Sequence, residues 1–257
     1  MSNQDAFEAR DVVRSYSSEN ELQKPEQTIL EMFRDRLKTM RLLDIGVGAG
    51  RTTPHFAPLA GQYIAIDYSH NMIEACKEKY PELAMRGCFK VCDARSMTAF
   101  ADEDFDFLLF SYNGLDYVSH DDRLEALREI RRIGKKGGYF CFSSHNLNTV
   151  LGDAFRIGFT LDPFRLSYRV GRRLLFKCLT MNFQRKREKA DYLIFNDGAH
   201  RFRSRTYYVR AEEQIRQLSD LGFSDIRVFD LSEGKEVVDR AALNENRDSW
   251  LYYLCRI

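Results

Sequence analysis

Glycines alternate with small apolar residues in the stretch Asp44-Ile-Gly46-Val-Gly48-Ala-Gly50, which follows two leucines. Glycine lets the backbone turn sharply and approach a ligand without obstruction by a Cβ atom. A helix that starts after such a turn also offers free N–H groups to an anionic ligand. We therefore predict that this stretch cradles a cofactor that carries a nucleoside.

The spacing of the glycines argues against a dinucleotide. The phosphate-binding pattern G-x-G-x-x-G, counted from Gly46, requires glycine at the position that Arg51 occupies. Asp44 would also bring negative charge close to a pyrophosphate. An acidic residue here is better matched to a positively charged cofactor group, such as the ammonium of a methionine derivative.

Two further acids follow the next two apolar segments. Asp67 lies about 20 residues after Gly46, the separation at which an acidic residue reaches a ribose in related folds. Ser69 is available to cap the next helix, so Asp67 is not needed as a cap. Asp93 alone would be an ordinary turn residue, but its order behind the other acids favours a role in binding.

The elements that position these residues alternate between strands and helices. Apolar patterns predict strands over 41–46, 62–67, 87–92, 105–111 and 137–144, and helices over 19–38, after Gly50, over 71–79 and over 121–133. A helix over 211–221 and strands over 224–230 and 249–257 follow. Five apolar strands separated mainly by helices predict a parallel sheet covered on both faces. The last two strands, joined without a clear helix, predict an antiparallel pair at one edge.

With LLDIGVGAG and acids at 44, 67 and 93 in this order, the chain resembles the class I S-adenosylmethionine-dependent methyltransferases. Val47 and Ala49 stand where many members have Cys and Thr. Leu221-Gly222-Phe223 resembles the segment before the sixth strand of the family. The resemblance implies one α/β domain over 1–257, a Rossmann-like seven-stranded mixed sheet of order 3-2-1-4-5-7-6 with strand 7 antiparallel.

The resemblance also implies how the cofactor, S-adenosylmethionine, is held and released as S-adenosylhomocysteine. Asp67 would bind the ribose, Tyr68 would lie beside the nucleoside, and Met72 would pack against adenine. The Asp93 carboxylate and the Ala94 N–H would bind the adenine edge. The cofactor-binding set is Tyr16, Asp44, Gly46, Gly48, Gly50, Asp67, Tyr68, Met72, Asp93, Ala94 and Ser111, in which the Ser111 backbone meets the methionine portion and Tyr16 belongs to a closing helix.

Methyl transfer asks little of the protein beyond alignment and exclusion of water, because a sulfonium methyl is already activated. Tyr112 or Asn113 would face the acceptor, although Asn113 and the glycine after it would also suit a simple turn. His145 is the first candidate for a general base, with His120 and His200 behind it. An Asn/Asp-Pro-Pro-Tyr/Phe sequence is absent at this place, which weakens any likeness to enzymes that methylate exocyclic amines.

Residues 146–206 interrupt the rhythm and carry 13 Lys and Arg against 5 Asp and Glu. We interpret them as a basic insertion after strand 5 that acts as a lid or substrate-recognition segment, with two strands around the Asn-Asp-Gly turn at 196–198. The charge could solvate a helical face, bind a small anionic metabolite for O- or N-methylation, or meet RNA, protein or an anionic membrane surface. A non-catalytic S-adenosylmethionine-binding subunit is a further alternative.

Composition limits the other classes. The six cysteines are scattered, and Cys88 and Cys92 lack a second Cys/His pair nearby, so we predict reduced thiols and no metal site. No apolar run reaches the ~20 residues that a bilayer span requires. The polar N-terminal segment lacks the features of a secretory signal, so the expected location is the cytoplasm.

Overall fold

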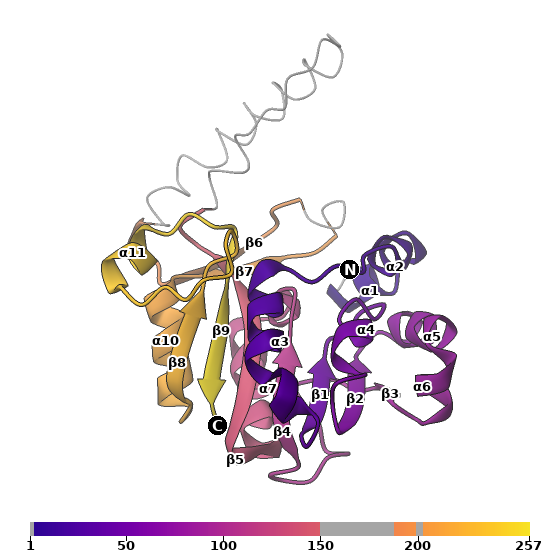
Figure 1. The fold of residues 1–257 in the computed structure, drawn as a ribbon. Helices are drawn as coiled ribbons and strands as arrows, with labels where there is room; N and C mark the ends of the chain where they lie inside the picture. Colours follow the sequence, from indigo (N-terminus) through magenta and orange to yellow (C-terminus); the bar gives the residue numbers. More distant parts are fainter. Residues whose placement is uncertain (1–2, 150–187, 199–202) are drawn as a thin grey trace.

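A single mixed sheet runs through the molecule (Figure 1). The computed structural model describes residues 3–149, 188–198 and 203–257. Its strands are β1 (Arg41–Ile45), β2 (Gln62–Asp67), β3 (Phe89–Val91), β4 (Phe105–Phe110), β5 (Gly134–Asn146), β6 (Tyr192–Phe195), β7 (Thr206–Val209), β8 (Ser224–Phe229) and β9 (Trp250–Arg256). The helices are α1 (Asn3–Phe7), α2 (Arg10–Ser17), α3 (Lys24–Leu37), α4 (Thr53–Phe56), α5 (His70–Lys79), α6 (Pro81–Met85), the 3-10 helix η1 (Gly114–Tyr117), α7 (His120–Ile133), α10 (Ala211–Asp220) and α11 (Arg240–Glu245).

The strand order confirms the predicted topology. Strands β3, β2, β1, β4 and β5 lie side by side in this order and are parallel. Strand β9 then pairs with β5 in the antiparallel sense, and β8 pairs with β9. These two strands are the seventh and sixth of the predicted order 3-2-1-4-5-7-6.

Helices bury both faces of this sheet, as the continuous apolar strands predicted. Side chains of successive strand residues point to opposite faces. Phe107 of β4 accordingly packs in a core with helices α3, α4 and α5, whereas Leu108 packs in a second core with α7 and α10. In Figure 1, α3 crosses in front of the strands. The loops at the carboxyl ends of the parallel strands are therefore anchored on a sheet that helices cover on both faces.

The two strands predicted around the Asn-Asp-Gly turn are present as β6 and β7, and they join the sheet in addition to its seven predicted strands. Strands β6 and β7 form an antiparallel pair in which Phe195 lies opposite Thr206. The connection therefore spans 196–205 and is longer than a tight turn at the Asn-Asp-Gly sequence. Of the rest of the insertion, 150–187 and 199–202 lie outside the described residues, including the clustered basic residues that motivated the lid prediction.

Strand β7 continues the sheet past the end of β4. The pairing of β4 with β5 ends at Phe142, while β9 still pairs with β5 at His145. His145 is also the register partner of Tyr208 in β7, in the parallel sense. Since β9 occupies one edge of β5 here, β7 lies at the other edge, on the side of β4. Strand β7, which begins at the last residue of the insertion, therefore brings Tyr208 next to His145.

Several boundaries differ from the sequence prediction for local reasons. The helix predicted over 19–38 begins at Lys24, because Pro25 is suited to a first helical turn. Ser69 caps α5, and its hydroxyl accepts a hydrogen bond from the N–H of Met72, as predicted. The prediction of no clear helix between the last two strands was wrong: α11 lies there, capped by Asp239.

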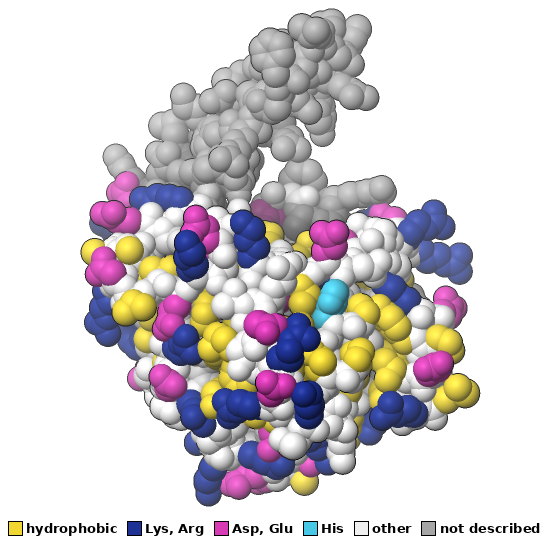
Figure 2. All heavy atoms as spheres, in the orientation of Figure 1, with side chains coloured by type: hydrophobic (Ala, Val, Ile, Leu, Met, Phe, Trp, Pro, Cys, Tyr) yellow, Lys and Arg dark blue, Asp and Glu magenta, His cyan; other side chains and the backbone are white. Residues whose placement is uncertain are grey.

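Charges on the described surface are mixed. On the face shown in Figure 2, Lys and Arg side chains alternate with Asp and Glu side chains and do not gather in one patch of a single sign. Among the described helices, none has the length and hydrophobicity needed to cross a membrane.

Candidate active site

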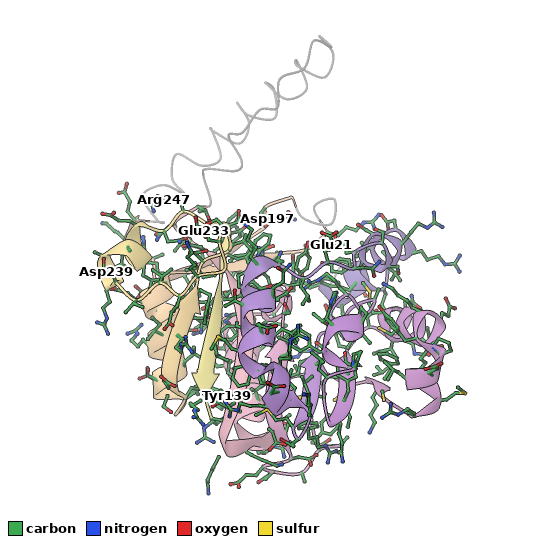
Figure 3. The ribbon with its side chains drawn as sticks, in the orientation of Figure 1. Glu21, Tyr139, Asp197, Glu233, Asp239 and Arg247 are labelled. Carbon is green, nitrogen blue, oxygen red and sulfur yellow. The ribbon has the colours of Figure 1, made fainter. Side chains whose placement is uncertain are left out.

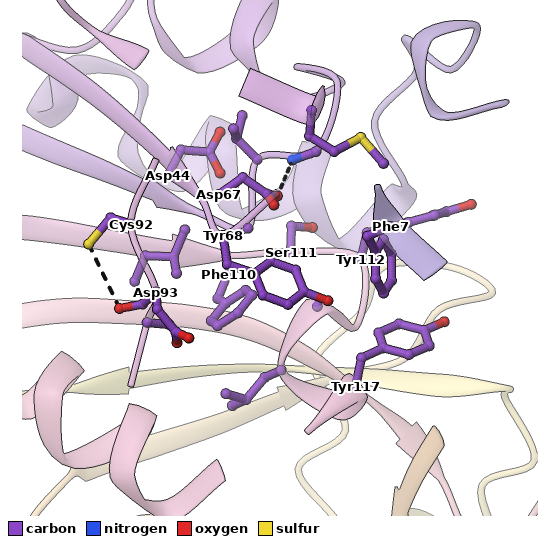
Figure 4. A pocket seen from close by; sticks show the side chains of 18 of the residues that line it. Phe7, Asp44, Asp67, Tyr68, Cys92, Asp93, Phe110, Ser111, Tyr112 and Tyr117 are labelled. Atoms are coloured by element: carbon purple, nitrogen blue, oxygen red, sulfur yellow. Dashed lines mark hydrogen bonds between the residues drawn. The ribbon is translucent and has the colours of Figure 1, made fainter. Parts of the chain in front are cut away.

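A pocket of about 990 Å³, including solvent at its mouth, lies at the carboxyl ends of β1, β2 and β4 (Figure 4). This is the edge at which open α/β sheets bind ligands. The pocket brings together these residues from the predicted set: Tyr16, Asp44, Gly46, Gly48, Asp67, Tyr68, Met72, Asp93, Ala94, Ser111 and Tyr112. Gly50, Asn113 and His145 lie outside its lining.

The glycine-rich turn needs its glycines for the backbone path. Gly46 and Gly48 have φ of +61° and +56°, in the left-handed region that favours glycine. A Cβ on Gly46 would lie 2.5 Å from Cε2 of Phe110, which is too close for any side chain. A Cβ on Gly48 would lie 3.5 Å from Cδ1 of Tyr16, within the pocket. The turn therefore leaves space that a ligand can fill.

Gly50 serves packing rather than the pocket wall. Its φ is +83°, and a Cβ there would lie 2.6 Å from Cε2 of Tyr80. The Tyr80 hydroxyl donates a hydrogen bond of 2.9 Å to the carbonyl oxygen of Gly50. Gly50 thus contacts the end of α5 in this structure, and its contact with the cofactor stays a prediction.

Asp67 is buried at the end of β2 and faces the pocket (Figure 4). Its Oδ2 accepts a hydrogen bond of 2.9 Å from the N–H of Gly48, and its Oδ1 accepts one of 2.8 Å from the N–H of Ser69. Burial raises its pKa to about 6, although these hydrogen bonds oppose the shift. A carboxylate with so little solvation is well suited to accept further hydrogen bonds from hydroxyl groups.

Asp44 is buried deeper in the polar interior of the turn. Its Oδ2 accepts hydrogen bonds from the Thr52 hydroxyl at 2.5 Å and from the Tyr63 hydroxyl at 2.8 Å. Burial raises the pKa of Asp44 to about 6, against the effect of these donors. Asp44 thus fixes the turn as well as lining the pocket, and its contact with a cofactor ammonium stays a prediction.

Asp93 and Ala94 line the pocket just after β3, and Met72 lines it from α5. Asp93 is partly exposed and pairs with Arg95, whose Nη2 lies 2.5 Å from Oδ2. Burial works to raise the pKa of Asp93, but the hydrogen bonds from Arg95 outweigh it and lower the pKa. Met72 is buried beneath the pocket. These positions fit the predicted adenine end, where Arg95 is an ion-pair partner that sequence reasoning missed.

A buried ion pair beside the pocket was also missed. Arg51, which served only to exclude a dinucleotide pattern, donates through Nη1 and Nη2 to both carboxylate oxygens of Glu26, at 2.7 and 2.5 Å. The hydroxyl of Ser111 donates to the same carboxylate and accepts from Arg51 at 3.2 Å. Burial favours a lower pKa for Arg51, but the bonds to Glu26 outweigh it and raise the pKa. The position of Arg51 directly after the third glycine was the sequence feature that could have indicated a charged residue at the pocket.

Tyr112 and Asn113 form a strained corner after β4. Both have positive φ, +56° and +61°, which non-glycine residues rarely adopt. The Tyr112 ring lines the pocket, and the Arg51 guanidinium lies 4.6 Å from its centroid. Asn113 instead turns into the interior, where its N–H donates to the Ser143 hydroxyl at 2.8 Å. Of the two residues predicted to face the acceptor, Tyr112 is the one at the pocket.

His145 is held by a buried carboxylate next to this corner. Its Nδ1 lies 2.7 Å from Oδ2 of Asp116, and its backbone N–H donates to the same oxygen at 2.7 Å. The other oxygen of Asp116 pairs with Arg123 at 2.5 Å and accepts from the Ser144 hydroxyl at 2.8 Å. A carboxylate at Nδ1 fixes the proton there and leaves Nε2 as the basic nitrogen. Sequence reasoning found His145 but not Asp116.

The other histidine candidates are placed differently. The His120 ring stacks on Tyr192, with centroids 4.2 Å apart, and its Nδ1 lies 2.9 Å from the Tyr207 hydroxyl oxygen. His120 thus belongs to the contact between α7 and the β6–β7 pair. His200 lies outside the described residues. Within the described ranges, no group of three His, Cys, Asp or Glu side chains could hold a metal ion.

Comparison with known proteins identifies the segment that supplies most of this pocket. Residues 43–142, from β1 into β5, match the family model described as "Methyltransferase domain". Over these residues the chain has a methyltransferase domain, and its fold is that of the class I S-adenosylmethionine-dependent methyltransferases. A solved structure of an S-adenosylmethionine-dependent methyltransferase from Mesorhizobium loti shares the fold with a TM-score of 0.60 at 17% identity, covering 91% of this chain and 98% of that one.

Two curated relatives match shorter stretches. An uncharacterized methyltransferase of Bacillus subtilis, YcgJ, is 31% identical over 106 residues, which are 41% of this chain and 40% of the relative. A demethylmenaquinone methyltransferase of Thermobifida fusca is 32% identical over 123 residues, which are 46% of this chain and 51% of the relative. The chain thus spans about half the length of these relatives, or less.

The pocket fits the cofactor of the class I methyltransferases on its own chemistry. The space beside Gly48 would be filled by a Cβ, and the desolvated Asp67 carboxylate matches a ribose that offers two hydroxyl donors. The aromatic rings of Tyr16, Tyr68 and Tyr112 supply apolar walls. S-adenosylmethionine is therefore the cofactor that these residues suit.

Proposed function

We propose that this protein transfers the methyl group of S-adenosylmethionine to a small-molecule acceptor. One observation supports this most strongly: the cofactor pocket ends beside a histidine that a buried carboxylate orients. Tyr117 links the two, because it lines the pocket and its ring centroid lies 6.3 Å from that of His145. The basic nitrogen of His145 therefore lies close to the end of the pocket at which the methyl group would be transferred.

In this proposal the predicted residues hold the cofactor along the pocket. Asp67 binds the ribose hydroxyls, and Asp93 with Ala94 binds the adenine edge. Tyr16, Tyr112 and the Ser111 backbone surround the methionine end. When bound, S-adenosylmethionine supplies a methyl group that its sulfonium already activates.

The contribution of the chain is positioning, water exclusion and proton removal. The partly buried rings around the methionine end exclude water from the acceptor. His145 Nε2 accepts the proton that a hydroxyl or amine acceptor loses, while Asp116 stabilises the resulting imidazolium. A positioned base of this kind contributes about 10²- to 10⁴-fold to the rate.

The acceptor class was predicted from the basic insertion as a small anionic metabolite, with RNA or protein as the alternative. The clustered Arg and Lys residues behind that prediction lie within 150–187, outside the described residues. The relative from Thermobifida fusca is named a demethylmenaquinone methyltransferase. A small-molecule acceptor is consistent with that name and with a pocket enclosed by aromatic side chains.

Calorimetric titration with S-adenosylhomocysteine tests the cofactor site. We expect binding by the wild type and a loss of at least tenfold in Asp67→Asn, which removes the charge that accepts the ribose hydroxyls. Asp106→Asn is the matched control. Asp106 lies near the amino end of β4, away from the pocket, and accepts hydrogen bonds from Arg41 and Lys135. Absence of binding by the folded wild type would refute the proposal.

Methyl transfer to a panel of acceptors then tests the base. His145→Gln should lower kcat by about 10²- to 10⁴-fold and leave the Kd of S-adenosylhomocysteine unchanged. His120→Gln is the control, since His120 contacts Tyr192 and Tyr207 instead of Asp116. If both variants lost activity equally, His145 would have no special role as base.

A further inference from the structure

Six aromatic side chains form a closed circuit at one end of the cofactor pocket. Each ring centroid lies 5.0–6.3 Å from the next, and successive ring planes are inclined by 66–90°. In order around the circuit they are Phe7, Tyr16, Tyr112, Trp250, His145 and Tyr117, and we call them the aromatic collar. They come from α1, α2, the corner after β4, β9, β5 and η1.

The collar adjoins the methionine end of the pocket. Four of its members also line the pocket, the exceptions being Trp250 and His145. In Figure 4, the rings of Phe7, Tyr112 and Tyr117 lie at the end of the pocket away from Cys92 and Asp93. A molecule bound against the collar would therefore lie beyond the cofactor and next to His145.

Two of the charged groups that reach the collar form ion pairs with their neighbours. The Asp116 carboxylate is shared between Arg123 and His145. The Arg51 guanidinium, stacked on Tyr112, is neutralised by the two bonds to Glu26. Neither pair offers a net charge to an acceptor. The Glu19 carboxylate, which hydrogen-bonds the Tyr112 side chain, adds negative charge, so the described wall of the collar favours a neutral molecule over an anion.

Strand β7 adds one more ring beside the base. The Tyr208 centroid lies 4.9 Å from that of His145, and the Tyr208 hydroxyl donates to Oδ2 of Asp197 at 2.8 Å. This carboxylate therefore also has a hydrogen-bond donor of its own. Flat rings on several sides of one basic nitrogen match a flat acceptor, because aromatic pairs gain attraction from offset or edge contacts.

We propose that the collar binds a neutral planar acceptor, an aromatic ring bearing a hydroxyl group, and that His145 deprotonates this hydroxyl. The inference rests on the proposed methyl transfer and names its acceptor class. The hydroxyl proton passes to His145 Nε2, an oxygen lone pair forms the bond to the methyl carbon, and the carbon–sulfur bond breaks with its electrons going to sulfur. The imidazolium then returns the proton to solvent.

Trp250 makes binding to the collar directly observable, because it is the single tryptophan of the chain. The test titrates the protein, saturated with S-adenosylhomocysteine, with four probes and follows tryptophan fluorescence and heat. The probes are catechol, cyclohexanol, benzoate and benzyltrimethylammonium. We expect saturable binding of catechol with a change in Trp250 emission, and binding at least tenfold weaker for the other three.

The variant Trp250→Leu removes a ring of the collar that does not line the cofactor pocket. Calorimetry should show catechol binding weakened about tenfold with the Kd of S-adenosylhomocysteine retained, which also reports that the variant is folded. Tyr139→Leu is the matched control: Tyr139 is a buried aromatic residue at the opposite end of the sheet from Asp197 (Figure 3). Catechol binding should be unchanged in that control.

The outcomes separate the two proposals. If S-adenosylhomocysteine does not bind, the proposed function itself fails. If S-adenosylhomocysteine binds but benzoate or benzyltrimethylammonium binds more tightly than catechol, the methyltransferase proposal stands and the neutral aromatic acceptor is refuted. Equal weakening by Trp250→Leu and Tyr139→Leu would likewise refute the collar as the acceptor site.

Discussion

The affinity for the cofactor should fall steeply in mild acid, because Asp67 must be ionised to accept hydrogen bonds from both ribose hydroxyls. Burial raises the pKa of Asp67 from 3.8 to about 6. At pH 5 only about one tenth of the molecules would carry the ionised form, whereas almost all do at pH 7.5. If the ionised form alone binds the ribose, the Kd of S-adenosylhomocysteine should rise about tenfold between pH 7.5 and pH 5.

The stability of the cofactor-free protein should change in the opposite direction. The folded state keeps a proton on Asp67 up to about pH 6, while the unfolded chain releases it near pH 3.8. The folded state thus binds more protons in this window, and the contribution of Asp67 to stability falls by about 3 kcal/mol as the pH rises through it. Binding and stability therefore have opposite pH trends for this one carboxyl group.

Calorimetric titrations at several pH values, with circular dichroism to verify folding, measure the effect. Asp67→Asn is the control: its affinity should be weak at every pH, and the tenfold trend should be reduced. Asp44, whose pKa is also raised to about 6, is present in both proteins and cannot produce a difference between them. A wild-type Kd that stayed within twofold from pH 7.5 to pH 5 would refute this account of Asp67.

Two further predictions concern stability. Gly46→Ala should lower the free energy of unfolding, measured by urea denaturation, by about 1–3 kcal/mol more than the control Gly87→Ala does. Both glycines have similar positive φ, but only a Cβ at Gly46 would clash with Phe110. Equal losses would show that the contact with Phe110 is unimportant. Glu26→Gln should lower the free energy of unfolding by about 3–5 kcal/mol, because it leaves Arg51 charged and buried without its partner. Replacing both Glu26 and Arg51 by Met should recover much of that stability. If the double variant were no more stable than Glu26→Gln, this account would be contradicted.

The sequence was informative about the cofactor half for a physical reason. The acidic binding residues there lie near or just after the end of an apolar strand, so local patterns indicate both the strand and the side chain at its end. Asp67 at the end of β2 and Asp93 after β3 could be predicted in this way, and both line the pocket. Positive φ at Gly46 and Gly48 agrees with the predicted turn.

The features that were missed depend on contacts between distant parts of the chain. Glu26 and Arg51 pair across 25 positions, and Asp116 reaches His145 across 29. No local pattern indicates which carboxylate will meet which base. Strand β7 was likewise assigned to a hairpin, but its place beside β5 depends on β4 ending before β5 does.

The collar has a consequence for how this protein assembles and diversifies. Its six rings span positions 7 to 250, so the circuit closes only when the earliest and the latest described elements are both docked. Contacts so distant along the chain form late, after the local units have already folded. The cofactor turn needs only neighbouring strands, whereas the acceptor wall is a property of the completed tertiary structure. Substitutions that alter acceptor choice can therefore be scattered along the whole chain while the cofactor half stays intact.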